Sequence, residues 1–380
     1  MFTSVMESRS AVLAQLGATE AEIEELLAYN HNDFHRDGFV APAAVPLESE
    51  PHVADWERYQ ADISSLGVLG ALRSRLVQLQ FPIQSGISQT ENYRAATRKG
   101  TLTVGMAEAT GLVLEHPEAL TLTIHPTLAG AIPVMIAGCR SDFVSLVQAL
   151  TRRNEPDVIP KSMGAAIVGG YNNWDRVQHY RQVWTAQEGH HEVSESDWQA
   201  EFQRLVPQKS RYQDRFIILS RGAYSAVAAT EMGLTEADWL DRSVTLRLEH
   251  ECCHYFTRRL FGAMRNNVLD ELIADYQGII AANNGIYHAD WFLRFAGLEA
   301  FPHYRDGGRL QNYVGDLSEG AVKVLQGLVK AAAENLERFN HKHLQDLKTR
   351  EAQFRLLTLL TFFTLEDLAI DRGALLEKAW

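Results

Sequence analysis

The feature that most constrains this chain is a pair of histidines placed four residues apart in a stretch that reads as helix. The pair, His250 and His254, belongs to the run HECCH, which also contains Glu251. Residues four apart lie one turn apart on the same helix face, so both imidazoles can bind one ion. Apolar residues flank the run on both sides. They predict a buried helix, in which charged groups need a partner.

An acidic motif follows on a second predicted helix. Glu271 lies seventeen positions after His254, and Asp275 lies four positions after Glu271. Glu271 can therefore supply a third, anionic ligand. Three protein ligands with an open position are typical of catalytic zinc, whereas structural zinc is normally closed by four protein ligands. We predict a Zn²⁺ site formed by His250, His254 and Glu271.

HExxH followed by ExxxD resembles the gluzincin branch of the zinc metallopeptidases, the zincins, over residues 244–278. The resemblance implies the same three ligands. It also implies that Glu251 is the general base on the metal-bound water and that Asp275 holds a ligand histidine from behind. Gluzincins often carry Asn before the third ligand; here that position is Asp270, which could compete with Glu271. The wider phrase, with RNN before LDELIADY, also resembles an uncharacterised bacterial HExxH family.

The implied activity is zinc-dependent hydrolysis of peptide or amide bonds. Zinc lowers the pKa of its bound water toward ~7 and polarises the substrate carbonyl. Glu251 would accept the proton as water attacks and pass it to the leaving group. The oxyanion needs a donor besides the metal, and gluzincins commonly use a downstream His or Tyr. The candidates are Tyr287, His288, His303 and Tyr304, of which we favour His303 and His288.

Two arginines lie on the same face of the predicted helix as the two candidate histidine ligands. Arg258 lies four residues after His254, and Arg247 lies three before His250. An arginine beside a metal site can bind a carboxylate through two parallel hydrogen bonds. We therefore expect a peptide or small amide substrate that carries a carboxylate. An ion pair between each arginine and a nearby acid is the alternative.

Two other functions remain open. A set of two histidines and one carboxylate also suits non-haem Fe²⁺, which would make the chain a tailoring enzyme in natural-product or peptide modification. The metal could instead stabilise a non-enzymatic interaction protein.

Composition and charge indicate which partners and which cellular location to expect. The chain has 380 residues with a net charge of −12, which argues against nucleic acid and anionic membrane as partners. The chain contains no run of 18 apolar residues, so we expect no membrane-spanning helix. The first residues lack the long apolar core of a signal peptide. The three cysteines, Cys139, Cys252 and Cys253, are too few for a disulfide framework. We expect a cytoplasmic protein.

The pattern of apolar residues predicts an α+β, mostly α-helical protein. Residues 1–110 read as a helical region, 111–310 as a zincin-like catalytic region, and 311–380 as a second helical region. Strand candidates are 120–126, 131–138 and 216–220. Thr19 and Glu22 have the spacing of a capping box at the start of a helix. The resemblance implies a two-lobed zincin-like fold, with a small sheet packed beside the HExxH helix.

Overall fold

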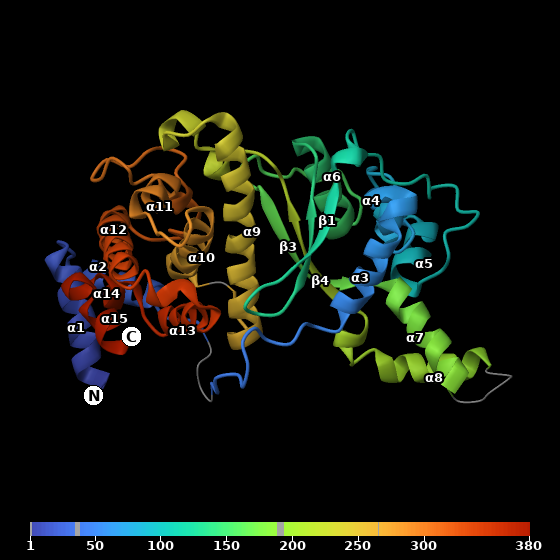
Figure 1. Cartoon of the computed structure of the whole chain (residues 1–380), viewed down its shortest axis with the longest axis horizontal. Helices are drawn as coiled ribbons and strands as arrows, with labels where there is room; N and C mark the ends of the chain where they lie inside the picture. The colour runs from blue at the N-terminus through green and yellow to red at the C-terminus, as the bar shows by residue number, and fades with distance from the viewer. Residues whose placement is uncertain (1, 35–38, 188–193, 265) are drawn as a thin grey trace. The chain divides into compact units, whose positions relative to one another are not determined.

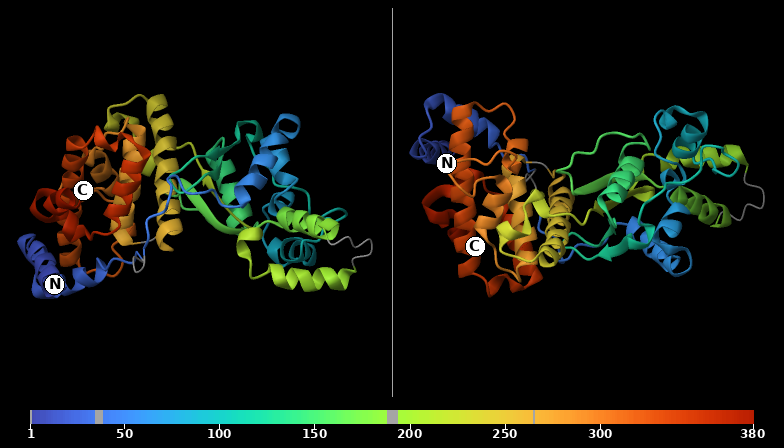
Figure 2. Two further views of the ribbon diagram at one scale, coloured as in Figure 1. Left: turned by 60° about the horizontal axis from the view of Figure 1, so that its bottom comes forward. Right: turned by 90° about the horizontal axis from the view of Figure 1, so that it is seen from above.

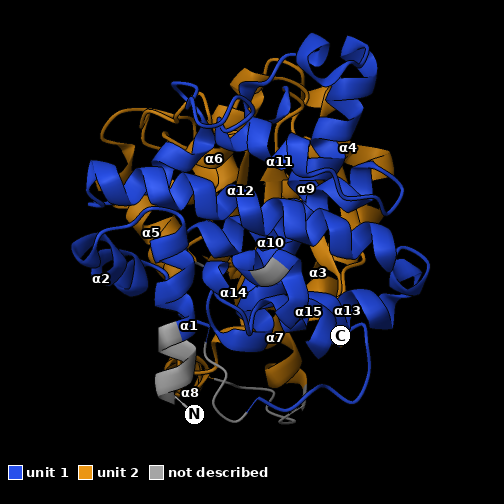
Figure 3. Ribbon diagram, turned by 90° about the vertical axis from the view of Figure 1, so that its left-hand side faces the viewer, with its two compact units in different colours: residues 1–47, 223–380 blue, residues 48–222 orange. Residues whose placement is uncertain are grey.

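The computed structural model describes residues 2–34, 39–187, 194–264 and 266–380. The chain forms two compact units: unit 1 comprises Met1–Leu47 and Ala223–Trp380, and unit 2 comprises Glu48–Gly222 (Figure 3). The protein is α+β and mostly helical, as predicted. The HExxH helix belongs to unit 1 and the sheet belongs to unit 2 (Figure 1), so their predicted packing against each other stays a prediction.

Unit 2 is built on a four-stranded mixed sheet with the order β1-β2-β4-β3. The strands are β1 (Thr121–His125), β2 (Ile132–Ile136), β3 (Ala165–Asn172) and β4 (Gln213–Leu219). The three predicted strands correspond to β1, β2 and β4, and β1 and β2 pair antiparallel as a hairpin. β4 lies parallel to β2 and antiparallel to β3. β3 was not predicted, because Gly169 and Gly170 interrupt its apolar pattern at a register shift.

Helices of unit 2 cover one face of this sheet. The α-helices are α3 (His52–Ala61), α4 (Ile63–Arg73), α5 (Glu91–Lys99), α6 (Arg140–Thr151), α7 (Trp174–Gln187) and α8 (Glu195–Leu205). The 3₁₀ helices are η1 (Val77–Gln80), η2 (Ile87–Gln89), η3 (Pro117–Ala119) and η4 (Lys209–Arg211). Alternate strand residues share a face, so Met135, Phe216 and Ile218 pack with Trp56 and Phe143 in one core.

Unit 1 is helical. Its α-helices are α1 (Phe2–Gln15), α2 (Glu20–Tyr29), α9 (Glu236–Phe261), α10 (Asn267–Ala282), α11 (Ala289–Ala296), α12 (Glu319–Lys342), α13 (Arg350–Leu360), α14 (Leu365–Ala369) and α15 (Ala374–Ala379). Its 3₁₀ helices are η5 (Tyr224–Ala226), η6 (Ala229–Met232), η7 (Arg309–Asn312), η8 (Asp346–Lys348) and η9 (Ile370–Gly373). Among the described residues, no helix combines the length and apolarity that a membrane crossing requires.

Local capping explains where several of these helices begin and end. The predicted capping box is present: Thr19 accepts from the backbone of Glu22, and the Glu22 carboxylate accepts from the Thr19 backbone at 2.8 Å. Thr235 caps the start of α9 in the same position. Gly262 ends α9 with a positive φ of 73°, a conformation that costs glycine little.

Candidate metal centre

The candidate site lies where α9 and α10 pack side by side (Figures 1 and 2). Their close approach depends on Gly278, because a Cβ there would stand 2.7 Å from the carbonyl oxygen of Leu246. Gly278 lies about one turn after Asp275, and Leu246 lies about one turn before His250. The crossing point of the two helices therefore holds the histidine motif of α9 against the acidic motif of α10.

The two histidines turn the same nitrogen toward each other. His250 Nε2 and His254 Nε2 lie 3.0 Å apart, and both side chains are buried. Glu271 faces this pair, with its carboxylate oxygens 3.7 Å from His254 Nε2 and 3.7 Å from His250 Nε2. The ligand atoms of these three residues lie within 4.8 Å of one another. The structure thus brings together the three residues that the sequence predicted as ligands.

An acid lies beside the other ring nitrogen of each histidine. His250 Nδ1 is hydrogen-bonded to Asp275 Oδ1 at 2.8 Å, whereas His254 Nδ1 lies 3.0 Å from Asp270 Oδ2 as an ion pair without hydrogen-bond geometry. A carboxylate at Nδ1 favours the tautomer that carries its proton there and leaves a lone pair on Nε2. When His254 is protonated, its Nε2–H donates to His250 Nε2 at 3.0 Å. A divalent metal ion bound by both Nε2 atoms would replace this proton.

Asp270 and Glu271 lie on different sides of the histidine rings, and this difference distinguishes the candidate metal ligand from the residue that supports a ligand. Asp270 lies on the Nδ1 side of His254, whereas Glu271 lies on the Nε2 side of both rings. Glu271 Oε2 is also buried without a hydrogen-bond donor among the described residues; its ion-pair neighbours, Arg309 Nη2 and His250 Nε2, both lie 3.7 Å away. A metal ion would give this carboxylate oxygen a closer partner. Between the two acids that the sequence left open, the geometry favours Glu271 as the third ligand.

Negative charge dominates the electrostatics of the cluster. Burial alone would lower the pKa of His254. The Asp270 carboxylate, with further contributions from Glu271 and Glu251, raises the imidazole pKa to about 10. The field that holds a proton this strongly also attracts a cation, because both are positive charges on the same nitrogen atoms.

Two residues not predicted from the sequence complete the support of His250. The Tyr224 hydroxyl donates to Asp275 Oδ1 at 2.6 Å, and Arg309 Nη1 donates to the Tyr224 hydroxyl at 2.7 Å. The Arg309 guanidinium also forms an ion pair with Asp275. Burial opposes ionisation of Asp275, but Arg309 and His250 outweigh burial and lower the pKa of this carboxyl. Asp275 therefore stays ionised beside His250, as an orienting residue requires.

Tyr313 is a third residue that the sequence did not single out. Burial raises the pKa of its hydroxyl; Arg309 opposes this rise, and the charge of Glu271 and a hydrogen bond to it add to the rise. A protonated phenol thus lies beside the third candidate ligand. Tyr313 and Arg309 both come from the segment around η7.

The candidate oxyanion donors have different surroundings. His303 is exposed and lines a pocket in unit 1. A ring nitrogen of His288, just before α11, lies within 4.8 Å of carboxylate oxygens of Asp290 and Glu337. Tyr287 is buried, and burial together with the charge of Asp275 raises the pKa of its hydroxyl. The hydroxyl of Tyr304 donates to the Gly308 carbonyl oxygen at 2.6 Å.

The two predicted substrate arginines differ in their surroundings. Arg247 is buried, donates to the Ala223 carbonyl oxygen at 2.6 Å, and lies over the Tyr224 ring at 5.6 Å. It therefore supports the turn that presents Tyr224. Arg258 is half-buried near the end of α9 and donates to Met264 Sδ at 3.7 Å.

The remaining residues of the HECCH motif differ in burial. Glu251 is half-buried on α9, between the two histidines in sequence. Cys252 and Cys253 are buried, and burial raises the pKa of both thiols well above the usual value. Burial, with the charge of nearby carboxylates, keeps both thiols protonated, and a protonated thiol is a poor nucleophile.

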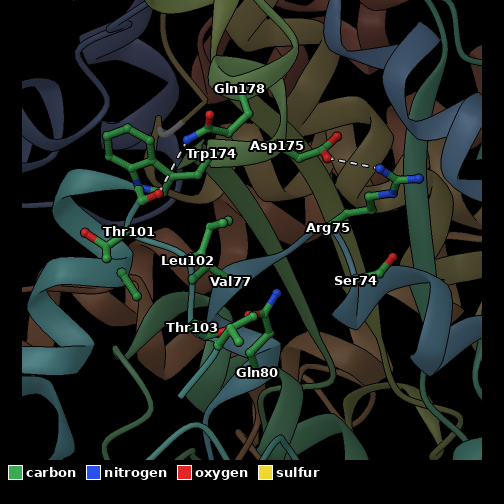
Figure 4. Close-up of a pocket in the computed structure, with 13 residues that line it drawn as sticks. Ser74, Arg75, Val77, Gln80, Thr101, Leu102, Thr103, Trp174, Asp175 and Gln178 are labelled. Atoms are coloured by element: carbon green, nitrogen blue, oxygen red, sulfur yellow. Dashed lines mark hydrogen bonds and ion pairs between the residues drawn. The ribbon is translucent and has the colours of Figure 1, made fainter. Parts of the chain in front are cut away.

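Unit 2 contains a cavity of about 250 Å³ (Figure 4). Several of its polar groups already have partners: Arg75 pairs with Asp175 at 3.2 Å, and Gln178 Nε2 donates to the Gly100 carbonyl oxygen at 3.4 Å. Groups that satisfy one another leave little directed hydrogen bonding for a ligand. We assign no chemistry to this cavity.

The fold and the cluster define an α+β protein with a candidate metal centre. Residues 11–372 match a family of unknown function, DUF7005, and the chain belongs to this family. Comparison with curated proteins gives no match, and comparison with solved structures gives none either. The family match extends over both units, so the candidate metal centre and the sheet lie within the shared sequence.

Proposed function

We propose that this protein is a metal-dependent hydrolase of peptide or amide bonds, with Zn²⁺ held by His250, His254 and Glu271. The observation that carries the proposal is the pair of Nε2 atoms 3.0 Å apart, faced by Glu271. Asp275 and Asp270 support this arrangement, because they fix the Nδ1 side of each ring.

Each residue of the site has a role in this proposal. Bound zinc would activate a water molecule and polarise the substrate carbonyl. Glu251 would accept a proton from the attacking water and deliver it to the leaving amine. Arg309 keeps Asp275 ionised, so that His250 keeps its Nδ1 proton and its orientation.

Tyr313 is the proposed donor to the oxyanion, in place of His303 and His288. Its hydroxyl lies beside Glu271, and the raised pKa keeps the proton on the phenol. A donor aimed at the position where negative charge develops stabilises the transition state more than the ground state. In this proposal Tyr313 takes the role for which the sequence offered Tyr287, His288, His303 and Tyr304.

Metal analysis with matched variants tests the proposal. About one zinc per chain is expected in the wild-type protein, and His254→Ala should lose it. Glu251→Gln should keep the metal and lose hydrolysis of a peptide library. Glu249→Gln, with the same charge change two residues away on α9, should retain both. Iron in place of zinc, with oxygen consumption, would favour the tailoring enzyme. A chain that binds no metal after reconstitution would refute the proposal.

A further inference from the structure

Unit 1 contains a second candidate site, a pocket of about 890 Å³ between the α11–α12 connection and the first turns of α12. The orange loop that joins α11 to α12 in Figure 1 forms one wall. The lining residues are Phe301, Pro302, His303, Tyr304, Leu310, Gln311, Val314, Gly315, Leu317, Glu319, Val322, Lys323 and Gln326. Pockets for small organic ligands have volumes of about 300–1,000 Å³, so this one falls in their range.

Apolar side chains form the body of the pocket. Leu310 and Val314 come from the segment around η7, and Val322 comes from α12. Phe301 lies at the opening with 37% of its surface exposed. An apolar lining of this size would stay in contact with water unless an apolar molecule covers it, and covering it is favourable.

One buried amide points to a ligand with a polar group. Gln326 is only 8% exposed, yet it lines the pocket. Its side chain makes no hydrogen bond to another described residue, and its amide atoms are accessible from the pocket. The amide is therefore available to bond to water in the pocket or to a ligand that displaces this water. A ligand with a carbonyl or an N–H group would supply the missing partner.

The charge at the rim indicates what else that ligand carries. Lys323 lies three positions before Gln326, on the same face of α12, and is exposed. Within the described residues, no carboxylate pairs with it. His303 lines the same opening. The one acid in the lining, Glu319, belongs to the first turn of α12, where a carboxylate offsets the helix dipole.

We propose that this pocket binds a small amphipathic carboxylic acid with an apolar chain and an amide, of the N-acyl amino acid class. The chain would fill the apolar body, the ligand amide would pair with Gln326, and the carboxylate would pair with Lys323. Binding at this site requires neither the metal nor hydrolysis. The pocket is nevertheless adjacent to the metal centre in sequence: its lining residues Leu310 and Val314 directly follow Arg309 and Tyr313.

Calorimetric titration with N-octanoyl-leucine tests this site. The titration uses the full chain with Glu251→Gln, so that the proposed hydrolysis cannot consume the probe. Saturable binding is expected. N-octanoyl-leucinamide, which lacks the carboxylate, should bind at least tenfold more weakly. Lys323→Glu should also weaken binding at least tenfold, and Gln326→Leu should weaken it several-fold. Lys330→Glu, the same charge change further along α12, is the matched control and should bind like the parent.

The results separate this site from the proposed function. Saturable binding in a chain that holds no metal would support the pocket even though the hydrolase had failed. A chain that holds zinc but shows no binding at millimolar probe would overturn the pocket and leave the hydrolase intact. Equal binding of the acid and the amide would overturn the role of Lys323. Equal binding by Lys323→Glu, Gln326→Leu and Lys330→Glu would place the probe elsewhere on the protein.

Discussion

Gly278 of α10 lies directly against Leu246 of α9, and a Cβ on Gly278 would stand 2.7 Å from the Leu246 carbonyl oxygen. Backbone atoms inside a helix cannot move aside alone, so a methyl group here would separate the two helices. Because the ligands come from both helices, the candidate metal centre depends on this contact.

Gly278→Ala should therefore destabilise the protein by about 1–3 kcal/mol and reduce metal occupancy. Denaturant unfolding and elemental analysis measure the two effects. Gly327→Ala on α12 is the control, because its Cβ would meet Leu16 Cδ2 at an ordinary 3.6 Å. Alanine is also the better helix former, so the control should be neutral or slightly stabilising. A Gly278→Ala protein with full stability and full metal content would disprove the dependence.

Arg309→Gln should leave Asp275 buried without its cation. Removing one partner of a buried ion pair typically costs about 3–5 kcal/mol, and Arg309 is 18% exposed, so we expect the lower end. The free energy of unfolding in urea gives the value. Arg305→Gln removes the more exposed ion pair with Glu299 and should cost about 0–1 kcal/mol. Equal losses in the two variants would mean that Arg309 has no special role.

Asp270 and Glu271 should respond differently to loss of charge, because one supports a ligand and the other is the proposed ligand. Asp270→Asn should weaken metal binding by about 10–100-fold, as expected for a residue behind a ligand histidine. Glu271→Ala should lower metal occupancy close to zero. Competition with a chromophoric chelator measures both affinities. Full occupancy in Glu271→Ala, with a larger loss in Asp270→Asn, would reverse the assignment.

Tyr313→Phe should lower kcat by about 10²–10³-fold, which is typical when an oxyanion donor is removed. Metal occupancy and KM should change little, because the hydroxyl acts mainly in the transition state. Steady-state kinetics on a substrate from the peptide screen provides the measurement. Tyr304→Phe removes a hydroxyl that is bonded to Gly308 instead and should keep near wild-type kcat. Similar kcat values for the two variants would exclude Tyr313 as the donor.

We expect the free energy of unfolding to depend on pH through the titration of Asp214 in unit 2. Burial raises its pKa from 3.8 to about 6, against the lowering effect of Arg176 and of hydrogen bonds from Asn173 and Trp56. The folded state therefore binds this proton more tightly than the unfolded state. Its contribution to stability is fully present below pH ~4 and is lost as the pH rises through about 6.

The Trp56 indole reports this titration, because its Nε1 donates to Asp214 Oδ2 at 2.8 Å. Its N–H resonance should shift with a midpoint near pH 6, and Asp214→Asn should abolish the shift. Trp239 is an internal reference, since its Nε1 donates to the uncharged Val227 carbonyl oxygen. A Trp56 resonance as constant as that of Trp239 would contradict the prediction.

Short-range patterns accounted for much of the fold. The α+β class, the β1–β2 hairpin, β4 and the capping box at Thr19 follow from alternation and side-chain spacing, which act between near neighbours in sequence. β3 was missed because its signal is weak locally: two adjacent glycines interrupt it, and pairing with β4 stabilises it. Strand pairing across a long sequence separation leaves no local pattern.

The metal centre, like the fold, was predictable from the sequence only where its residues are close neighbours along the chain. The pairing of His250 with His254 on one helix face, and of Glu271 with Asp275 on another, was determined by the sequence alone, since helical periodicity acts over four residues. Only the tertiary structure decided that Glu271 rather than Asp270 faces both Nε2 atoms, that Tyr224 and Arg309 support Asp275 behind His250, and that Tyr313 lies beside Glu271. These contacts join segments far apart in the chain, so tertiary packing sets them, not spacing along the sequence.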